Sequence, residues 1–277
     1  MSTLVFSQYH GNTIIGVSPG KRSFGVPPGG PLNPWIVEEA KELLGHENCA
    51  VIEIIAPIHV EAQQNIRVAS VRLNREFGVV LLSLDSGKHT FTPPSSGVGY
   101  LALISETPRP FQSISLTSVE LEVPESPAIS PLRADYSNYL DNTPTLRVIW
   151  NTDFQPATGK IESISRVGAR VSVEGAPKLE SPRRSLPTVP GAIQLSPSGE
   201  LLIHGPDGPV TGGYPIIGGV ISADLHKFSL WNPNLAIRFQ PVSREEAVEA
   251  HANLLKSHQA RLKKLEIARR IHLGDTR

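Results

Sequence analysis

The sequence predicts a mainly β protein with one internal helix and one C-terminal helix. A series of short segments rich in Val and Ile is bounded by Gly, Pro, Ser and Asn, as is typical of strands. The 25 prolines and 23 glycines are scattered without a period through the 277 residues, so they divide the chain into many short elements. This pattern favours β-barrels or β-sandwiches, and the length predicts two domains.

The predicted strands extend along most of the chain. They comprise residues 66–71, 77–84, 100–104, 114–123, 146–150, 170–174, 192–195, 201–204, 216–221 and 235–239. The proline-rich stretch between the fourth and fifth of these strands indicates a linker. We therefore predict a first subdomain over residues 1–123, a linker over 124–145, a second subdomain over 146–242, and a helix and tail over 243–277.

The internal helix has clear start and stop signals. Asn33 is suited to the N-cap, Pro34 to the first helical position, and Gly45 to the position just past the end. The C-terminal helix opens with Ser243 and Glu246 at the spacing of a capping box. The basic residues near its end either stabilise the helix by complementing its dipole or contact an anion.

Composition excludes several classes of partner. Lys and Arg together number 26, as do Asp and Glu, so no bulk positive field attracts nucleic acid or an anionic membrane. Cys49 is the single cysteine, which excludes an internal disulfide and a thiolate zinc cluster. No signal-like N-terminus or long apolar run is present, and histidine spacing does not indicate a metal site. We expect a cytoplasmic protein without a metal, nucleic-acid partner or membrane partner.

The segment Thr211–Pro215, with sequence TGGYP, is the strongest candidate for a site. Two adjacent glycines allow φ > 0 and close approach of a ligand, and the Tyr-Pro pair restricts the backbone that carries the phenol. The alternative interpretation is a glycine hairpin turn between two strands.

Two further candidates lie in the first half. The glycine-rich stretch containing Gly29 and Gly30 leads to the helix capped at Asn33, so it predicts either an anion-binding helix start or a tight turn. Glu53 lies in the apolar run AVIEIIA, on the same strand face as Val51. A carboxylate there is either a structural acid or a site residue with a raised pKa.

An ordered set of motifs resembles one known family. The motifs are GVPPGGPLN, AVIEI, GVGYLAL, LRVIW, ISRVGARVSVEG, VPGAIQLSPSGE, TGGYPIIGGVISADL and PVSREEA. In this order they resemble the carboxyltransferase-like family that includes the C-type subunit of 5-oxoprolinase, allophanate hydrolase subunit 2, the KipA-type antagonists and the matching part of urea carboxylase. The similarity extends to about Ala247.

The resemblance implies a fold, an activity and partners. It implies two cyclophilin-like β-barrel subdomains, beside a KipI-like first subunit. In 5-oxoprolinases a third subunit of the LamB/YcsF type joins them, and the complex opens 5-oxoproline to glutamate with ATP hydrolysis. ATP is then a cofactor of the complex, and the small-molecule substrate is an amide. We expect no biotin attachment in this chain.

The resemblance also implies site residues. The catalytic candidates are Arg166, Tyr214 and Glu53, and the substrate-binding candidates are Gly29, Gly30, Asn33, Gly191, Thr211, Gly212, Gly213 and Asp224. Arg166 would hold a carboxylate, the glycine N–H groups an oxyanion, and Tyr214 the substrate amide. The alternative for Arg166 is a buried ion pair with Asp224 or Asp207.

The chain departs from the family pattern at several cleft positions. Residues 17–21 replace a Gln-Asp-x-Gly-Arg element, Val210 replaces a threonine, and residues 105–111 form a shorter connection. Three hypotheses follow: a subunit of an amide-cleaving 5-oxoprolinase complex, a biotin-dependent carboxyltransferase component as in urea carboxylase, and a non-catalytic binding or regulatory homologue.

Overall fold

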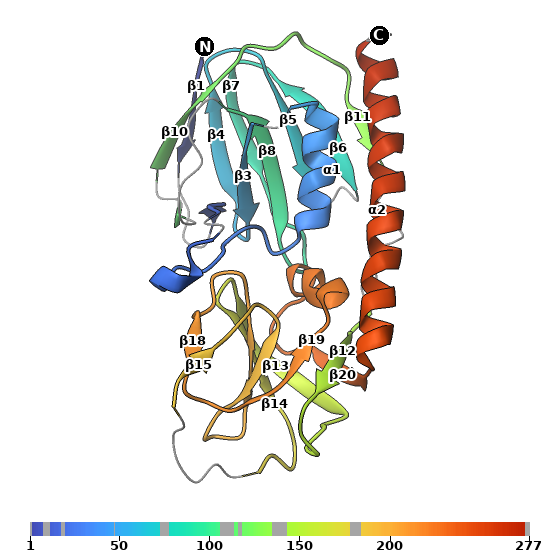
Figure 1. Cartoon of the computed structure of the whole chain (residues 1–277). Helices are drawn as coiled ribbons and strands as arrows, with labels where there is room; N and C mark the ends of the chain where they lie inside the picture. The colour runs from blue at the N-terminus through green and yellow to red at the C-terminus, as the bar shows by residue number, and fades with distance from the viewer. Residues whose placement is uncertain are drawn as a thin grey trace. The chain divides into compact units, whose positions relative to one another are not determined.

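The protein forms two compact units, each built mainly from strands (Figure 1). The computed structural model describes residues 2–7, 12–17, 20–46, 48–72, 78–105, 114–115, 118–134, 143–177 and 184–274. Unit 1 comprises Met1–Val17, Pro34–Tyr139 and Ser257–Arg277, and unit 2 comprises Ser18–Asn33 and Leu140–Lys256. The mainly β class, the internal helix and the C-terminal helix are confirmed. Neither unit is continuous in sequence, whereas the subdomains predicted from the sequence are contiguous ranges.

Unit 1 contains two sheets among its described residues. The four-stranded sheet has the order β10 (Ser118–Val123), β1 (Ser2–Ser7), β4 (Ile58–Ala62) and β7 (Gly87–Phe91). The seven-stranded sheet has the order β11 (Leu132–Ala134), β6 (Val79–Leu84), β5 (Ile66–Val71), β8 (Gly99–Ile104), β3 (Cys49–Ile54), β2 (Thr13–Ile14) and β9 (Ile114–Ser115). The described strands of this unit thus pair as two sheets, whereas unit 2 forms a closed barrel.

The core of unit 1 is a cluster of apolar side chains contributed by both sheets. Phe6 and Val60 come from the four-stranded sheet, and Ile52, Val68 and Leu101 from the seven-stranded sheet. Helix α1 (Pro34–Leu44) packs against β5, β6 and β8 of the seven-stranded sheet (Figure 1). Its apolar stripe is buried there, as its helical spacing predicts.

Unit 2 is a closed barrel with the strand order β12, β19, β16, β17, β14, β13 and β20. These strands are β12 (Thr145–Trp150), β13 (Thr158–Ser165), β14 (Gly168–Ser172), β16 (Ala192–Leu195), β17 (Leu201–His204), β19 (Ile216–Val220) and β20 (Ala236–Pro241). The pairs are antiparallel except β12 with β20, which is parallel and closes the barrel. Closure leaves no free edge in the barrel, and inward-facing residues fill it.

Shorter elements complete unit 2. β15 (Leu186–Pro187) pairs with β18 (Thr211–Gly212) outside the barrel, and the 3-10 helical segments are η1 (Arg22–Phe24) and η2 (Ser222–Ser229). Helix α2 (Arg244–Leu273) begins in unit 2 and ends in unit 1. Its predicted capping box is confirmed, because the Ser243 and Glu246 side chains each accept the other's backbone N–H, at 3.1 and 2.7 Å.

Most predicted strands are present, and several of the missed strands share one property. β5, β16 and β17 coincide with the predicted segments, whereas residues 114–123 divide into β9 and β10. Three of the missed strands, β4, β7 and β13, carry polar residues on their exposed faces, so they lack a continuous apolar run. Within the predicted linker, residues 132–134 form β11 at the edge of the seven-stranded sheet. Phe77 lies outside the described residues.

Candidate functional site

A cavity of about 400 Å³ lies in unit 2 beside the TGGYP segment. It is lined by residues of β13, β14, β16 and β17 and by part of the segment that leads into β19. Gly212, Gly213 and Tyr214 form one wall, and Gln194 and His204 come from neighbouring barrel strands. The segment with the clearest sequence signal therefore borders a cavity of the size typical of small-molecule sites.

Gly212 is needed for space rather than for a left-handed backbone. Its φ lies outside the region that favours glycine. A Cβ added at this position would lie 2.7 Å from Oε1 of Gln194 and closer still to its Nε2. Thr211 and Gly212 pair with Pro187 and Leu186, so this segment is part of a small sheet and not the turn of a hairpin between barrel strands. Thr211 is exposed and lies outside the cavity lining.

Two buried polar side chains stabilise the cavity wall. Gln194 donates from Nε2 to the carbonyl of Tyr214 at 2.9 Å, and its Oε1 lies 2.9 Å from Nε2 of His204. Burial lowers the pKa of His204, and the Pro209 carbonyl, which favours a protonated ring, offsets part of this effect. A neutral His204 therefore fits its buried position beside the cavity, on the strand face opposite the barrel core residues Leu201 and Ile203.

Charged side chains at the cavity form an exposed pair. Arg170 lines the cavity and donates from Nη2 to Oε2 of Glu200 at 2.5 Å. This hydrogen bond and the charge of Glu200 raise the pKa of Arg170, and the same bond lowers the pKa of Glu200. Arg170 thus places a permanent positive charge beside a cavity whose other described lining residues carry none.

Arg166 forms an ion pair with Asp207, one of the two acids that the sequence analysis named as its possible partner. The other acid was Asp224. Its Nε donates to Oδ2 of Asp207 at 2.7 Å, and its Nη2 donates to the carbonyl of Gly30 at 2.7 Å. The guanidinium therefore connects the turn that carries Arg166 with the turn at Asp207 and with the glycine-rich segment at Gly30, all within unit 2. Arg166 is not among the cavity-lining residues, so its catalytic role stays a prediction that this geometry does not favour.

Glycines allow these turns to pack closely. A Cβ at Gly168 would collide with the carbonyl of Ile203, and one at Gly205 with the carbonyl of Arg166. The N–H of Gly205 donates to the Val167 carbonyl at 2.8 Å. The close approach of the 166–168 and 205–208 turns shapes the cavity beside them.

Asp224 and Gly191 have structural partners instead of facing the cavity. Asp224 is fully buried and accepts from the backbone N–H of Arg147 at 2.8 Å and from its Nη2 at 2.6 Å. Lys227 Nζ lies 3.4 Å from Asp224 and donates to the carbonyl of Thr145. Gly191 adopts a φ of 85° and donates to the carbonyl of His204. Neither predicted substrate-binding residue lines the cavity.

The predicted residues of the first glycine-rich segment also have internal partners. Gly29 and Gly30 adopt φ values of 67° and 90°, as the glycine pattern predicts, and the Gly29 N–H donates to the Pro206 carbonyl at 3.2 Å. Asn33 is buried and donates to Ser229 Oγ at 3.2 Å. These contacts favour the interpretation of a structured turn within unit 2.

Glu53 belongs to unit 1, whereas the barrel and its cavity belong to unit 2. It is buried on β3, between Thr13 of β2 and Tyr100 of β8 in the strand register. Its catalytic role remains a prediction.

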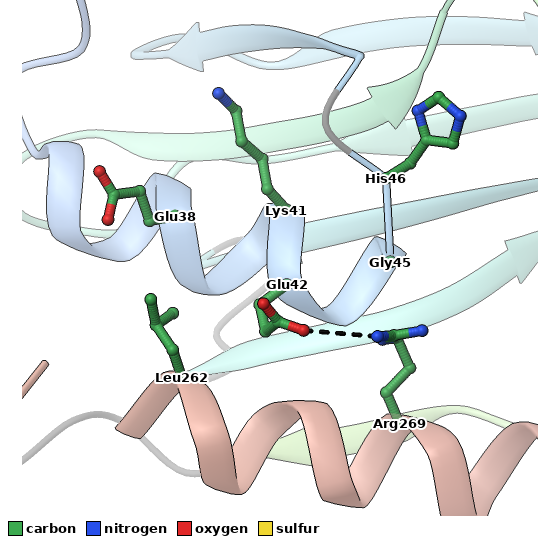
Figure 2. Close-up of a pocket in the computed structure, with 7 residues that line it drawn as sticks. All are labelled: Glu38, Lys41, Glu42, Gly45, His46, Leu262 and Arg269. Carbon is green, nitrogen blue, oxygen red and sulfur yellow. Dashed lines mark hydrogen bonds and ion pairs between the residues drawn. The ribbon is translucent and has the colours of Figure 1, made fainter. Parts of the chain in front are cut away.

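A second cavity, of about 530 Å³, lies in unit 1 between α1 and α2. Figure 2 shows Glu42 of α1 and Arg269 of α2 facing one another, with Nη2 and Oε1 3.4 Å apart. Leu262 points from α2 toward α1 in the same view. A hydrogen bond between His258 Nε2 and Glu38 Oε2, at 2.7 Å, and an ion pair of Arg261 with Glu39 also join these helices. The groove is thus bordered by contacts between helices, and it contains no predicted site residue.

Within the described ranges, no group of three or more His, Cys, Asp or Glu side chains is placed to hold a metal ion. None of the helices there is long and apolar enough to cross a membrane.

Sequence reasoning missed Gln194, His204 and Arg170. Gln194 and His204 interrupt the otherwise apolar strands AIQL and LLIH, and both are buried. A polar residue on a buried strand must find a partner, so this interruption was the available signal. Arg170 lies on an exposed strand face and gives no comparable signal.

Comparisons with known proteins support a relationship for the second half of the chain. Residues 142–241 match the model of the family described as "Carboxyltransferase domain, subdomain A and B". The C-type subunit of 5-oxoprolinase from Haemophilus influenzae is 41% identical over 59 residues, which are 21% of this chain and 19% of that protein. The match therefore spans about a fifth of the length of that relative.

Solved structures support the fold over most of the chain. A crystal structure of TTHA0988 has a TM-score of 0.72 at 21% identity, covering 88% of this chain and 56% of the other. The Kluyveromyces lactis urea carboxylase has a TM-score of 0.71 at 17% identity, covering 93% and 29%. The K. lactis urea amidolyase has a TM-score of 0.72 at 18% identity, covering 94% and 20%. At these identities the likeness establishes the fold.

Proposed function

We propose that this chain, whose residues 142–241 belong to the carboxyltransferase-domain family, is the component of a 5-oxoprolinase-type complex that corresponds to its C-type subunit. The complex opens the lactam ring of 5-oxoproline to glutamate with ATP hydrolysis. The observation that carries the proposal is the cavity beside Gly212, Gly213 and Tyr214, a segment that lies within the residues matching the family model. The relative from Haemophilus influenzae, named as a 5-oxoprolinase component, supports the choice of reaction.

The cavity suits a small anionic amide. 5-Oxoproline carries a carboxylate, an amide N–H and a carbonyl on a five-membered ring. Arg170 supplies positive charge for the carboxylate, and Ser163 supplies a hydroxyl in the same cavity. We assign the backbone N–H group of Gly213 to the oxyanion that develops when the amide carbonyl is attacked, since the pairing of Gly212 with Leu186 occupies the Gly212 N–H. Tyr214, whose side chain is partly exposed, orients the amide.

The proposal includes partner proteins. Part of the reactive site comes from a KipI-like first subunit, and the complex also holds a LamB/YcsF-type protein. ATP is bound by the complex, and this chain contributes substrate binding through the cavity of unit 2.

The test is reconstitution of the complex. We expect co-expression with the KipI-like and LamB/YcsF-type proteins to give a stable assembly that forms glutamate and hydrolyses ATP when 5-oxoproline is added. Arg170→Met should raise KM for 5-oxoproline several-fold, because it removes the positive charge at the cavity. The control is Arg238→Met, since Arg238 is exposed on β20 and does not line the cavity.

Other outcomes would favour the rival functions. Transfer of a carboxyl group from a supplied carboxybiotin carrier, without 5-oxoproline turnover, would favour the carboxyltransferase hypothesis. A stable, pure assembly that shows neither reaction would favour the non-catalytic one.

A further inference from the structure

We propose that Gln194 and His204 are positioning residues that hold the main chain of Gly212–Tyr214 as a fixed wall of the cavity. The inference rests on the proposed function, because it concerns the cavity assigned to the substrate. Neither side chain needs to touch the substrate for this role. Both line the cavity, and both are almost fully buried, with exposed fractions of 3% and 6%.

The hydrogen bonds fix the orientation of the Gln194 amide. The carbonyl of Tyr214 accepts hydrogen bonds only, so the nitrogen of the amide must face it, at 2.9 Å. Oε1 therefore faces His204, whose Nε2 lies 2.9 Å away and must carry the proton. A continuous chain of hydrogen bonds thus extends from His204 on β17 through Gln194 on β16 to the main chain at Tyr214.

Gly212 packs directly on the polar edge of the same amide. A Cβ at Gly212 would lie 2.7 Å from Oε1 and 2.9 Å from Cδ of Gln194, with Nε2 nearest of all. These distances place the Gly212 Cα over the edge formed by the amide nitrogen and oxygen. A substrate therefore cannot form hydrogen bonds with the amide of Gln194. The amide instead contributes by holding the 212–214 segment in place.

Strand irregularities mark the same region. The pairing of β16 with β19 shifts register between Ile193 and Gln194, and the pairing of β13 with β14 shifts between Ile161 and Ser163. A bulge redirects the side chains that follow it and is frequent beside sites. Gln194 and Ser163 both follow such shifts, and both line the cavity.

Stability alone does not account for this pair. Burying an amide and an imidazole beneath the 212–214 segment costs free energy that their hydrogen bonds approximately offset, whereas apolar side chains of similar size would pack without that cost. The polar pair adds directional contact with one main-chain carbonyl, which fixes the position of the cavity wall.

Kinetics of the reconstituted complex test the role. His204→Leu removes the N–H donor, and we expect kcat/KM for 5-oxoproline to fall about fivefold, the typical net effect of one hydrogen bond. KM for ATP should not change. His204→Gln keeps an amide N–H near the position of Nε2 and should recover most of the loss. Equal kcat/KM values in the wild type and His204→Leu would overturn the inference.

Hydrogen exchange tests the inference independently of the reaction. In the isolated full chain, His204→Leu should accelerate exchange of the amides at residues 212–214, while His204→Gln and the barrel strands retain wild-type rates. If His204→Leu fails to fold, Gln194→Glu replaces the donor to Tyr214 with an acceptor of the same size and should show the same acceleration. Unchanged exchange in these variants would overturn the inference. A third outcome combines the two experiments: exchange at residues 212–214 is faster in these variants, but the wild-type complex never turns over 5-oxoproline. This outcome would refute the proposed function and support the positioning role.

Discussion

Asp224→Ala should destabilise unit 2 strongly without acting on the substrate directly. The Asp224 carboxylate is fully buried and accepts hydrogen bonds from the backbone and guanidinium of Arg147. Its loss removes the carboxylate that faces Lys227, whose side chain is 1% exposed. Removing one partner of a buried ion pair typically costs about 3–5 kcal/mol. A loss of that size corresponds to a decrease in Tm of roughly 10 °C.

Urea unfolding followed by tryptophan fluorescence measures this loss, because Trp150 and Trp231 report on unit 2. The double variant Asp224→Ala/Lys227→Met should be more stable than the sum of the single losses, since the second change removes the buried cation that faced the carboxylate. Glu200→Ala is the control, because it breaks the exposed pair with Arg170 and should change stability little.

A loss below about 1 kcal/mol in Asp224→Ala would refute the importance of this buried network for stability. A variant that kept its stability but lost affinity for 5-oxoproline would instead support the assignment of Asp224 as a substrate-binding residue.

Three further outcomes are expected. Gly212→Ala should lower kcat/KM for 5-oxoproline about tenfold or more in steady-state assays, because the new Cβ displaces the Gln194 amide and the cavity wall with it. Arg67→Met should not lower the urea midpoint, because the Arg67 charge is unfavourable where it lies. Burial and the charge of Arg269 both lower the pKa of Arg67, and its Nε has no hydrogen-bond partner in the described part of the chain. The pKa of His204 is lowered in the folded protein, so the unfolded chain takes up the proton first as pH falls below the ordinary value of 6.5. Wild-type stability should therefore decrease more between pH 7 and pH 5 than that of His204→Gln, as thermal melts at each pH will show.

Local features of the fold could be predicted from the sequence because their determinants are close together along the chain. The Ser243 and Glu246 capping box needs residues three positions apart, and it forms as predicted. Strands β16 and β17 follow from short apolar runs bounded by turn residues. The mainly β class follows from many such elements together.

Long-range contacts within the candidate site could not be predicted in the same way. Arg166 and Asp207 are 41 positions apart, and Arg147 and Asp224 are 77 apart. The sequence left both acids open as partners of Arg166, and the barrel topology decides between them. The amide of Gln194 beneath Gly212 likewise depends on the register of β16 with β19. The glycine pair borders the cavity for a different physical reason than the one predicted, since Gly212 needs space and not a left-handed backbone.

Hydrogen-exchange footprinting of 5-oxoproline on the reconstituted complex tests the central claim most directly. With 5-oxoproline and a non-hydrolysable ATP analogue present, we expect slower exchange at residues 163–170 and 192–214, which border the barrel cavity. Unchanged exchange there, with protection confined to another part of the complex, would contradict the claim that the barrel cavity binds the substrate.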